Sequence, residues 1–452
     1  MKRSHWAILS CLLALAAPVA LRAQTAELPK KEISEKTSSS LGQLRTLTEA
    51  KDYTGSLALI DGLLATAAPT SFDAYVLTQI KAQILLTQGK LVEAIAPLET
   101  ALKLGEGNAN FFDAPTNLEQ LNLLAQLYYQ QAAESKQPAA QKAGYEKALA
   151  TINRWLERSP RPTADIRLFA SSLLYQLATV DASKPDAARI RESITQANEG
   201  LLLAIKPSTQ LYLILVACHL QLGETARAAE ILEILAERDP KSSSTWSQLQ
   251  SIYLSTASEI KDPEEARRQN LRALLVLDRA QAAGQLKSPK DNYTRVAILF
   301  NIQQFTRAAA LLEKGLADGS IEGSKRNWEL LASAYQQTSE NEKALDALTR
   351  AATKFPDDAA LEFSLAQFLY NTGKLADAYA RGQAAVAKGT LEKPGQAQVY
   401  LAYLAFELQR YEEASKWVAD ARASGGVPAS TLDPLATAIG DALSSRQKLE
   451  RL

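Results

Sequence analysis

The sequence predicts an all-α protein built as a solenoid of antiparallel helix pairs. Apolar residues recur with helical spacing, as Trp328, Leu331 and Tyr335 do on one face of a predicted helix. The same pattern returns about every 34 residues along much of the chain. One helix pair buries too little apolar surface to offset a conformational entropy loss of about 1–2 kcal/mol per residue. Neighbouring pairs therefore have to stack on one another.

Residues 327–356 contain the most complete copy of the repeating unit. Its predicted first helix carries two large aromatic residues, Trp328 and Tyr335, seven positions apart. Leu331 and Ala332 lie between them on the same helical face. The polar segment "QQTSEN" that follows predicts the turn between the two helices.

The predicted second helix carries Ala344, Leu348 and Ala351 on one face. We expect Ala344 and Ala332 to lie where the two helices approach most closely, because a larger side chain there would hold them apart. Pro356 ends the second helix, since proline lacks the backbone donor and clashes with the preceding turn.

The small residue of the second helix recurs along the chain. Equivalent alanines stand at positions Ala94, Ala148, Ala228, Ala308, Ala378 and Ala414. The order W-x2-L-A-x2-Y, then A-x3-L, then P, at a period of about 34 residues, resembles the tetratricopeptide repeat. This resemblance implies a right-handed superhelical solenoid over residues 40–424.

The first 23 residues have the order of a secretory signal peptide. Lys2 and Arg3 precede the apolar run "AILSCLLALAAPVAL", and Ala23 is a small residue at the expected cleavage point. The apolar run is shorter than the roughly 20 residues of a membrane-spanning helix. We therefore predict a signal peptide over residues 1–23, cleavage after Ala23 and no integral membrane span after cleavage. An uncleaved anchor is the alternative.

Three further stretches depart from the repeat. Residues 24–39 are polar and aperiodic, which predicts a flexible leader. The alanine spacing widens around residues 133–145, and a polar stretch interrupts the array at 256–264. We expect longer turns or insertions at both places.

The C-terminal segment predicts a capping helix over residues 430–448. Asp433 is a natural N-cap, and Pro434 suits the first helical position. One apolar stripe follows, formed by Leu435, Ala438, Ile439 and Ala442. We expect this helix to shield the last repeat from water.

The residues offer no catalytic, cofactor-binding or metal-binding constellation. After signal cleavage the chain keeps one histidine, His219, and one cysteine, Cys218. Adjacent residues on a helix point about 100° apart, so these two cannot begin a zinc site. We expect both to be packing residues. The near-zero net charge provides no broad basic field for nucleic acid. We predict no enzyme, no cofactor and no nucleic-acid partner.

Helical spacing also identifies residues that face the concave side of the array, where solenoids commonly bind extended segments. The predicted partner-binding groove is formed by Phe363, Gln367, Tyr370, Val399, Tyr403 and Phe406. Alternatively, neighbouring second helices or the capping helix cover these side chains. Tetratricopeptide domains that grip a C-terminal carboxylate use Lys and Asn on this surface. The matching positions here do not favour that mode, since they hold Glu329, Ser333, Phe363 and Gln367.

Several longer phrases carry a closer resemblance. They include "AAALLEKGLADGSIEGSKRNWELLASAYQQTSENEKALDAL" and "LEKPGQAQVYLAYLAFELQRYEEASKWV". These phrases resemble a family of exported bacterial tetratricopeptide-repeat proteins that is named as a component of the TonB system. Its genes often accompany those for ExbB, ExbD and TonB. The resemblance spans roughly residues 40–424.

The resemblance implies a non-enzymatic periplasmic scaffold for protein–protein interaction. It implies association with the TonB–ExbB–ExbD system that energises outer-membrane transport, with those proteins as partners. The alternative is a general periplasmic adaptor in envelope biogenesis or polysaccharide export.

Overall fold

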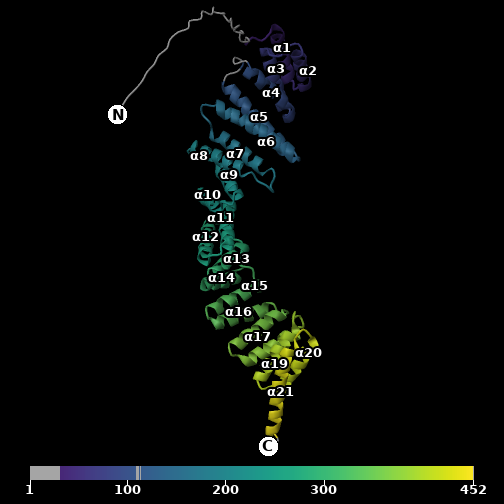
Figure 1. Cartoon of the computed structure of the whole chain (residues 1–452), viewed down its shortest axis with the longest axis vertical. Coiled ribbons are helices and arrows are strands. Elements are labelled where there is room, and N and C mark those ends of the chain that lie inside the picture. Colours follow the sequence, from purple (N-terminus) through teal and green to yellow (C-terminus); the bar gives the residue numbers. More distant parts are fainter. Residues whose placement is uncertain (1–30, 108–110, 112–113, 451–452) are drawn as a thin grey trace, which may run out of the picture. The chain divides into compact units, whose positions relative to one another are not determined.

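The computed structural model describes residues 31–107, 111 and 114–450, and every regular element among them is an α-helix (Figure 1). The predicted all-α solenoid fold is confirmed. The chain divides into two compact units, Met1–Leu222 and Gly223–Leu452. A solenoid has no single central core, because each pair contacts only its neighbours, and its buried residues form several separate clusters. The predicted signal peptide lies outside the described residues.

The described part of unit 1 contains nine helices. The strongest pairings join α3 with α4, α5 with α6, and α7 with α8. The helices are α1 (Glu35–Glu49), α2 (Tyr53–Leu64), α3 (Phe72–Thr87), α4 (Leu91–Gly107), α5 (Ala114–Glu134), α6 (Pro138–Arg158), α7 (Ala164–Thr179), α8 (Ala187–Leu202) and α9 (Thr209–Gln221).

The described part of unit 2 contains twelve helices. Its strongest pairings join α11 with α12, α15 with α16, α17 with α18, and α19 with α20. The helices are α10 (Thr225–Arg238), α11 (Ser243–Glu259), α12 (Pro263–Ala282), α13 (Pro289–Asn301), α14 (Phe305–Asp318), α15 (Lys325–Gln337), α16 (Asn341–Lys354), α17 (Ala359–Asn371), α18 (Leu375–Ala387), α19 (Pro394–Glu407), α20 (Tyr411–Ser424) and α21 (Ala429–Glu450).

The predicted small residues lie at closely packed helix contacts. Ala332 on α15 retains 2% of its surface, and Trp328 and Tyr335 on the same helix are buried. The alanines of the second helices are all 0% exposed, namely Ala94, Ala148, Ala228, Ala308, Ala344, Ala378 and Ala414. The predicted packing faces of the helix pairs are therefore confirmed.

Polar contacts join consecutive helix pairs beside these alanines. Glu313 on α14 accepts hydrogen bonds from the Tyr335 hydroxyl at 3.3 Å and from Arg350 on α16 at 2.6 Å. The Arg350 guanidinium lies 4.6 Å from the Trp328 ring centroid, and the Lys343 ammonium lies 5.4 Å from that of Tyr335. One glutamate of a second helix thus contacts both helices of the following pair.

The same arrangement occurs earlier in unit 2. Glu233 on α10 accepts from Tyr253 at 3.3 Å and from Arg279 at 2.6 Å. Arg279 lies over the Trp246 ring at 5.1 Å and Arg272 over the Tyr253 ring at 5.9 Å. In both cases the glutamate stands five residues after a fully buried alanine, Ala308 or Ala228. The repeat therefore fixes the position of its polar contacts as well as its apolar ones.

The predictions for 133–145 and 256–264 left longer turns or insertions open. Longer turns are wrong, because the additional residues lengthen the helices. Helices α5 and α6 each have 21 residues, and α11 and α12 have 17 and 20. Short turns connect them, and Pro138 and Pro263 occupy the first helical positions of α6 and α12. The polar residues misread as turns lie on exposed helix faces near these ends.

The predicted leader over residues 24–39 ends earlier than expected, because α1 begins at Glu35. Ser34 is its N-cap, and the Ser34 hydroxyl accepts from the backbone N–H of Thr37 at 3.3 Å. Thr37 and Leu44 are its buried residues. The first buried position of α1 holds Thr37, which is a small polar residue. The spacing of apolar residues therefore does not reveal the first turn of this helix.

The C-terminal helix begins one turn before the predicted cap. Helix α21 starts at Ala429, and the Thr431 N–H bonds to the Pro428 carbonyl at 3.0 Å, so Pro434 lies inside the helix. Asp433 is not the cap and pairs with Arg422 on α20. Helix α21 packs against α20 and α19, with Ile439 buried at 2% exposure. The stripe also includes Leu432, which the sequence analysis did not assign and which is 2% exposed.

Among the residues that the structure describes, none of the helices is both long and apolar enough to traverse a lipid bilayer.

Substituting Ala332 by leucine should lower the free energy of unfolding by about 1–3 kcal/mol, because the added bulk must be accommodated at a closed helix contact. Gln336→Leu adds an apolar side chain to the same helix at an exposed position and should change stability little. Urea denaturation midpoints of the two variants provide the comparison. Equal midpoints would show that the close contact does not limit packing.

Candidate partner-binding face

Helices α17 and α19 turn one apolar face inward and leave a second aromatic face outward. Asp358 caps α17 by accepting from the Leu361 N–H at 2.9 Å, and Pro394 begins α19 at its first turn. Leu365 and Leu401 are fully buried on the packing face. Helical geometry then directs residues that lie off this face toward the opposite side.

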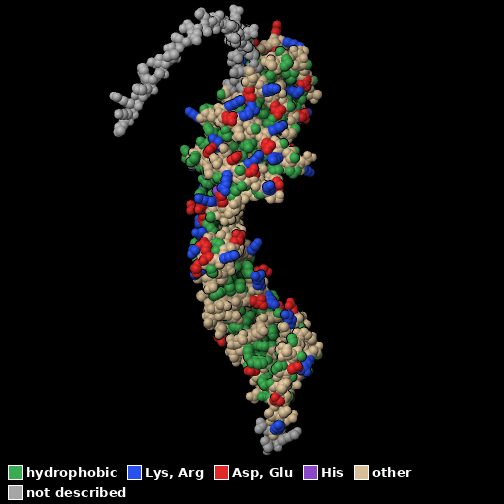
Figure 2. All heavy atoms as spheres, viewed as in Figure 1, with side chains coloured by type: hydrophobic (Ala, Val, Ile, Leu, Met, Phe, Trp, Pro, Cys, Tyr) green, Lys and Arg blue, Asp and Glu red, His purple; other side chains and the backbone are tan. Residues whose placement is uncertain are grey.

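Four aromatic side chains from α17 and α19 contact one another in sequence, and we call this set the aromatic strip. Phe363 meets Tyr400 with ring centroids 5.3 Å apart, and Tyr400 meets Tyr370 at 6.0 Å. Tyr370 meets Tyr403 at 6.0 Å, and all three contacts are edge-to-face. Such geometry favours the ring quadrupoles and holds the side chains in place. Figure 2 shows hydrophobic side chains gathered on the surface over these helices.

Hydrogen bonds join the hydroxyl groups of the strip. The Tyr370 hydroxyl donates to that of Tyr403 at 3.3 Å, and Tyr400 donates to the Ala366 carbonyl at 3.4 Å. The neighbouring Tyr370 hydroxyl and Glu407 carboxylate raise the pKa of Tyr403 to about 12. Burial, with a smaller contribution from Tyr370, raises the pKa of Tyr400 to about 12. Both phenols are therefore neutral at physiological pH and available as hydrogen-bond groups.

The strip remains accessible. Tyr403 keeps 40% of its surface exposed, and Phe363, Tyr370 and Tyr400 are half-buried. Gln367 lies exposed on the face of α17 between Phe363 and Tyr370. The neighbouring second helices and α21 therefore leave much of this face open to solvent.

The structure brings together only part of the predicted groove. Phe363, Tyr370 and Tyr403 lie in the strip, and Gln367 lies beside it. Phe406 contacts Tyr411 of α20 instead, with ring centroids 5.6 Å apart.

Two residues on α19 differ from the sequence-based assignment. Val399 is half-buried and packs against the core of unit 2, as Tyr370 and Tyr400 also do, but it makes none of the ring contacts of the strip. Tyr400, which contacts two other rings of the strip, was not assigned. Its position three residues before Tyr403 was the available signal, whereas the predicted face follows a spacing of four from Val399.

A pocket of about 690 Å³ adjoins one end of the strip. Phe363 belongs to both, so the two surfaces are continuous. Charged residues of both signs line the pocket, including Lys325, Asp358 and Lys393. Lys325 forms an ion pair with Asp358 at 2.8 Å. This end can therefore contact polar or charged groups, whereas the strip itself is uncharged.

Glu362 connects α17 to α18 directly behind Phe363. Only 4% of Glu362 is exposed, and its carboxylate accepts from Arg381 at 2.9 Å and from Lys388 at 3.1 Å. Burial alone would raise the pKa of Glu362, but the two basic partners lower it overall. The ion pairs fix the rotation of α17 and hence the direction in which Phe363 points.

Across the residues with described side chains, no group of three or more His, Cys, Asp or Glu side chains is arranged to hold a metal ion. Cys218 is buried on α9 with its sulfur 3.3 Å from the Ser193 hydroxyl. Burial raises the pKa of the thiol, although the Ser193 contact opposes this effect. His219 is half-buried on the same helix. Cys218 is therefore a packing residue, as expected.

Residues 329–391 match the tetratricopeptide repeat family. The match covers most of α15, all of α16 to α18, and the strip residues Phe363 and Tyr370. The chain therefore contains tetratricopeptide repeats, as the spacing predicted. Proteins with these repeats are in general non-enzymatic scaffolds that bind other proteins. No curated protein matches the sequence.

Several solved structures are similar to parts of the chain. A thermophilic tetratricopeptide-repeat protein of Thermus thermophilus shares 21% identity, covering 46% of this chain and 100% of its own, with a TM-score of 0.25. YrrB, a repeat protein with an unusual peptide-binding site, shares 18% identity over 48% and 99%, with a TM-score of 0.32. PilW, a type IV pilus biogenesis factor, shares 17% identity over 50% and 99%, with a TM-score of 0.32. All three TM-scores are low, and the repeat assignment rests on residues 329–391.

Replacing Glu362 by glutamine should lower the free energy of unfolding at neutral pH by about 1.5–3 kcal/mol, because two charged hydrogen bonds are weakened at a buried site. The folded-state pKa of Glu362 is lowered, so its stabilisation is present above the ordinary value of 4.5 and is lost as the pH falls through the folded-state value. The difference in unfolding free energy between wild type and variant should therefore become smaller at acidic pH.

Denaturant unfolding at several pH values measures this difference. Glu329→Gln is the control, since the Glu329 side chain is 38% exposed and lies 3.9 Å from Lys325 at its nearest approach. It should change stability by less than about 0.5 kcal/mol. If the difference in unfolding free energy between wild type and Glu362→Gln does not change with pH, the ion pairs of Glu362 do not contribute to stability.

Proposed function

We propose that the protein is a non-enzymatic scaffold whose aromatic strip binds an extended segment of a partner protein. The observation that carries the proposal is the continuous contact of Phe363, Tyr400, Tyr370 and Tyr403 across two adjacent repeats. A face used only for internal packing would not leave Tyr403 at 40% exposure beside three half-buried rings.

The physical properties of the strip suit a polypeptide. Tyrosine provides a large apolar surface with few rotatable bonds, so little conformational entropy is lost on binding. Its neutral hydroxyl groups can exchange hydrogen bonds with the backbone of an extended chain. A few aromatic anchors commonly dominate the affinity of an interface. Since the four strip side chains are uncharged, binding should depend only weakly on salt.

We further propose that the protein acts in the periplasm and that its partner belongs to the TonB–ExbB–ExbD system. The order of residues 1–23 supports export. The resemblance of the repeat phrases to the exported TonB-associated family supports the choice of partner. A general adaptor role in envelope biogenesis or polysaccharide export is the competing assignment.

The double substitution Tyr370→Ala with Tyr403→Ala tests the proposal. Each truncation removes an anchor worth about 1–2 kcal/mol of affinity, so the pair should weaken binding by at least about tenfold. Chemical crosslinking in envelope fractions, followed by identification of TonB, ExbB and ExbD, provides the readout. Circular dichroism confirms that the variant is folded.

The matched control is Leu271→Ala with Leu275→Ala. These two leucines are 39% and 61% exposed on α12, so the control also removes exposed apolar surface, but away from the strip. It should leave capture unchanged. Undiminished capture by the tyrosine variant would exclude the strip as the binding face. If the wild-type protein captures none of the three proteins, the TonB assignment fails and the general adaptor remains.

A further inference from the structure

The indole N–H of Trp328 on α15 is a buried hydrogen-bond donor to which no residue that the structure describes offers an acceptor. Trp328 is 6% exposed, and its Nε1 atom is buried. Buried polar groups in folded proteins nearly always have a hydrogen-bond partner. An acceptor from outside the described chain is therefore expected at this position.

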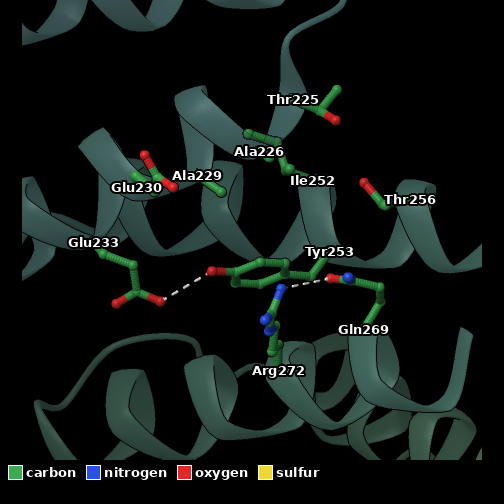
Figure 3. Close-up of a pocket in the computed structure, with 10 residues that line it drawn as sticks. All are labelled: Thr225, Ala226, Ala229, Glu230, Glu233, Ile252, Tyr253, Thr256, Gln269 and Arg272. Atoms are coloured by element: carbon green, nitrogen blue, oxygen red, sulfur yellow. Dashed lines mark hydrogen bonds between the residues drawn. The ribbon is translucent and has the colours of Figure 1, made fainter. Parts of the chain in front are cut away.

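The repeat formed by α11 and α12 shows where such an acceptor comes from. Its polar contacts match those of the Trp328 repeat, and the hydrogen bond from Tyr253 to Glu233 is drawn in Figure 3. The Trp246 indole N–H of that repeat donates to the Pro240 carbonyl at 2.8 Å. The acceptor is thus a backbone carbonyl six residues before the tryptophan.

The carbonyl six residues before Trp328 belongs to Glu322, and two other donors already use it. It accepts from the Asn327 side-chain amide at 2.8 Å and from the Ser324 N–H at 2.9 Å. A carbonyl oxygen has two lone pairs, so no acceptor capacity remains for the indole. The counterpart of Asn327 in the other repeat is Thr245, which leaves the Pro240 carbonyl to the tryptophan.

A second donor lies beside the first, next to Gly323. A Cβ atom added to Gly323 would lie 4.0 Å from Trp328 Nε1 and 2.5 Å from Lys354 Nζ. The two nitrogens therefore border the same small space. Lys354 is the last residue of α16 and is exposed, so its side chain can move to admit a ligand.

The two cations near Trp328 differ in their pairing. Arg350, whose guanidinium lies 4.6 Å from the ring centroid, pairs with Glu313 at 2.6 Å and with Asp346 at 3.4 Å. No ion pair joins Lys354 to an acidic side chain within the described part of the chain. One neutral donor and one uncompensated cationic donor therefore face the space at Gly323.

We propose that the Trp328 indole N–H and the Lys354 ammonium bind a carboxylate group. One carboxylate oxygen accepts from the indole and the other from the ammonium, and a single negative charge matches the single unpaired cation. A phosphate group brings three acceptor oxygens and a larger charge, which two donors match less well. A free organic acid and an acidic side chain of another protein both present the proposed ligand.

The site is distinct from the surfaces already considered. It does not use the positions that correspond to the carboxylate-gripping Lys and Asn of other tetratricopeptide domains, which here hold Glu329, Ser333, Phe363 and Gln367. It also does not depend on the function proposed for the aromatic strip.

The test uses acetate as the probe and full-length protein labelled with ¹⁵N at its tryptophans. Acetate added at constant ionic strength should shift the Trp328 indole N–H resonance saturably, because that N–H gains a charge-assisted hydrogen bond. Trp246 and Trp417 are internal controls, since their indole N–H groups already donate to the Pro240 carbonyl and the Tyr379 hydroxyl, each at 2.8 Å. Neither control resonance should shift. The Trp328→Phe variant assigns the resonance by its loss.

Lys354→Gln should weaken acetate binding by about tenfold or more, because a neutral donor replaces the ammonium. The matched control is Lys416→Gln, which removes an exposed lysine next to Trp417 in the sequence. It should leave acetate binding at Trp328 unchanged.

Gly323→Ala provides a second variant, because its methyl group enters the space that the ligand needs. The only atom that this methyl would approach within 3 Å is the terminal nitrogen of Lys354, so the protein should still fold. Acetate binding should weaken. The control is Gly440→Ala, since a Cβ at Gly440 meets no atom within 4 Å.

The proposal is overturned if acetate produces no saturable shift at Trp328, which is the result expected when water alone occupies the site. It is also overturned if the three indole resonances shift alike, or if Lys354→Gln and Gly323→Ala both bind acetate as wild type does. Inorganic phosphate that binds more tightly than acetate would contradict the assignment to a carboxylate. A blocked Gly-Asp-Gly tripeptide distinguishes the two sources. Tighter binding of the tripeptide than of acetate assigns the site to an acidic side chain, and weaker binding assigns it to a free organic acid.

Discussion

The close approach of paired helices at one small residue determines most of this structure. In seven second helices that residue is an alanine with no exposed surface. A contact of this kind sets the separation and rotation of the two helices, because interiors packed at this density resist even one additional methylene group. Once the two helices of a pair are fixed relative to each other, each of their side chains points in a defined direction. Tyr335 and Tyr253 then reach a glutamate of the preceding pair, and Arg350 and Arg279 reach the same glutamates.

The aromatic strip follows from this constraint. Leu365 and Leu401 occupy the packing faces of α17 and α19. The four rings of the aromatic strip lie beside these faces, and two of them, Tyr370 and Tyr400, also pack against the core of unit 2. Glu362 holds α17 on α18 behind the strip through two ion pairs.

Much of the fold could be predicted from the sequence because its determinants are local and periodic. Trp328, Leu331, Ala332 and Tyr335 are buried as their spacing required. The additional length of helices such as α5 and α12 was not predicted, because the exposed polar ends of a helix have an amino-acid composition similar to that of a loop. The predicted groove did not include Tyr400. Residues on one helical face can be spaced by three or by four, and the spacing of four selects Val399 where the spacing of three selects Tyr400. The glutamate contacts of Tyr335 and Arg350 join residues 22 and 37 positions apart, and no local pattern reports such pairings.

Site-specific photocrosslinking tests the central claim, that the strip is the face that meets a partner. A benzophenone side chain at Gln367 would lie exposed between Phe363 and Tyr370, and one at Ala384 would lie exposed on α18, the second helix of the same repeat. The account predicts that the probe at position 367 crosslinks to TonB, ExbB or ExbD in intact cells and that the probe at position 384 does not. Equal crosslinking from both positions, or no crosslink from position 367 to any protein, would contradict the claim that the strip meets a partner.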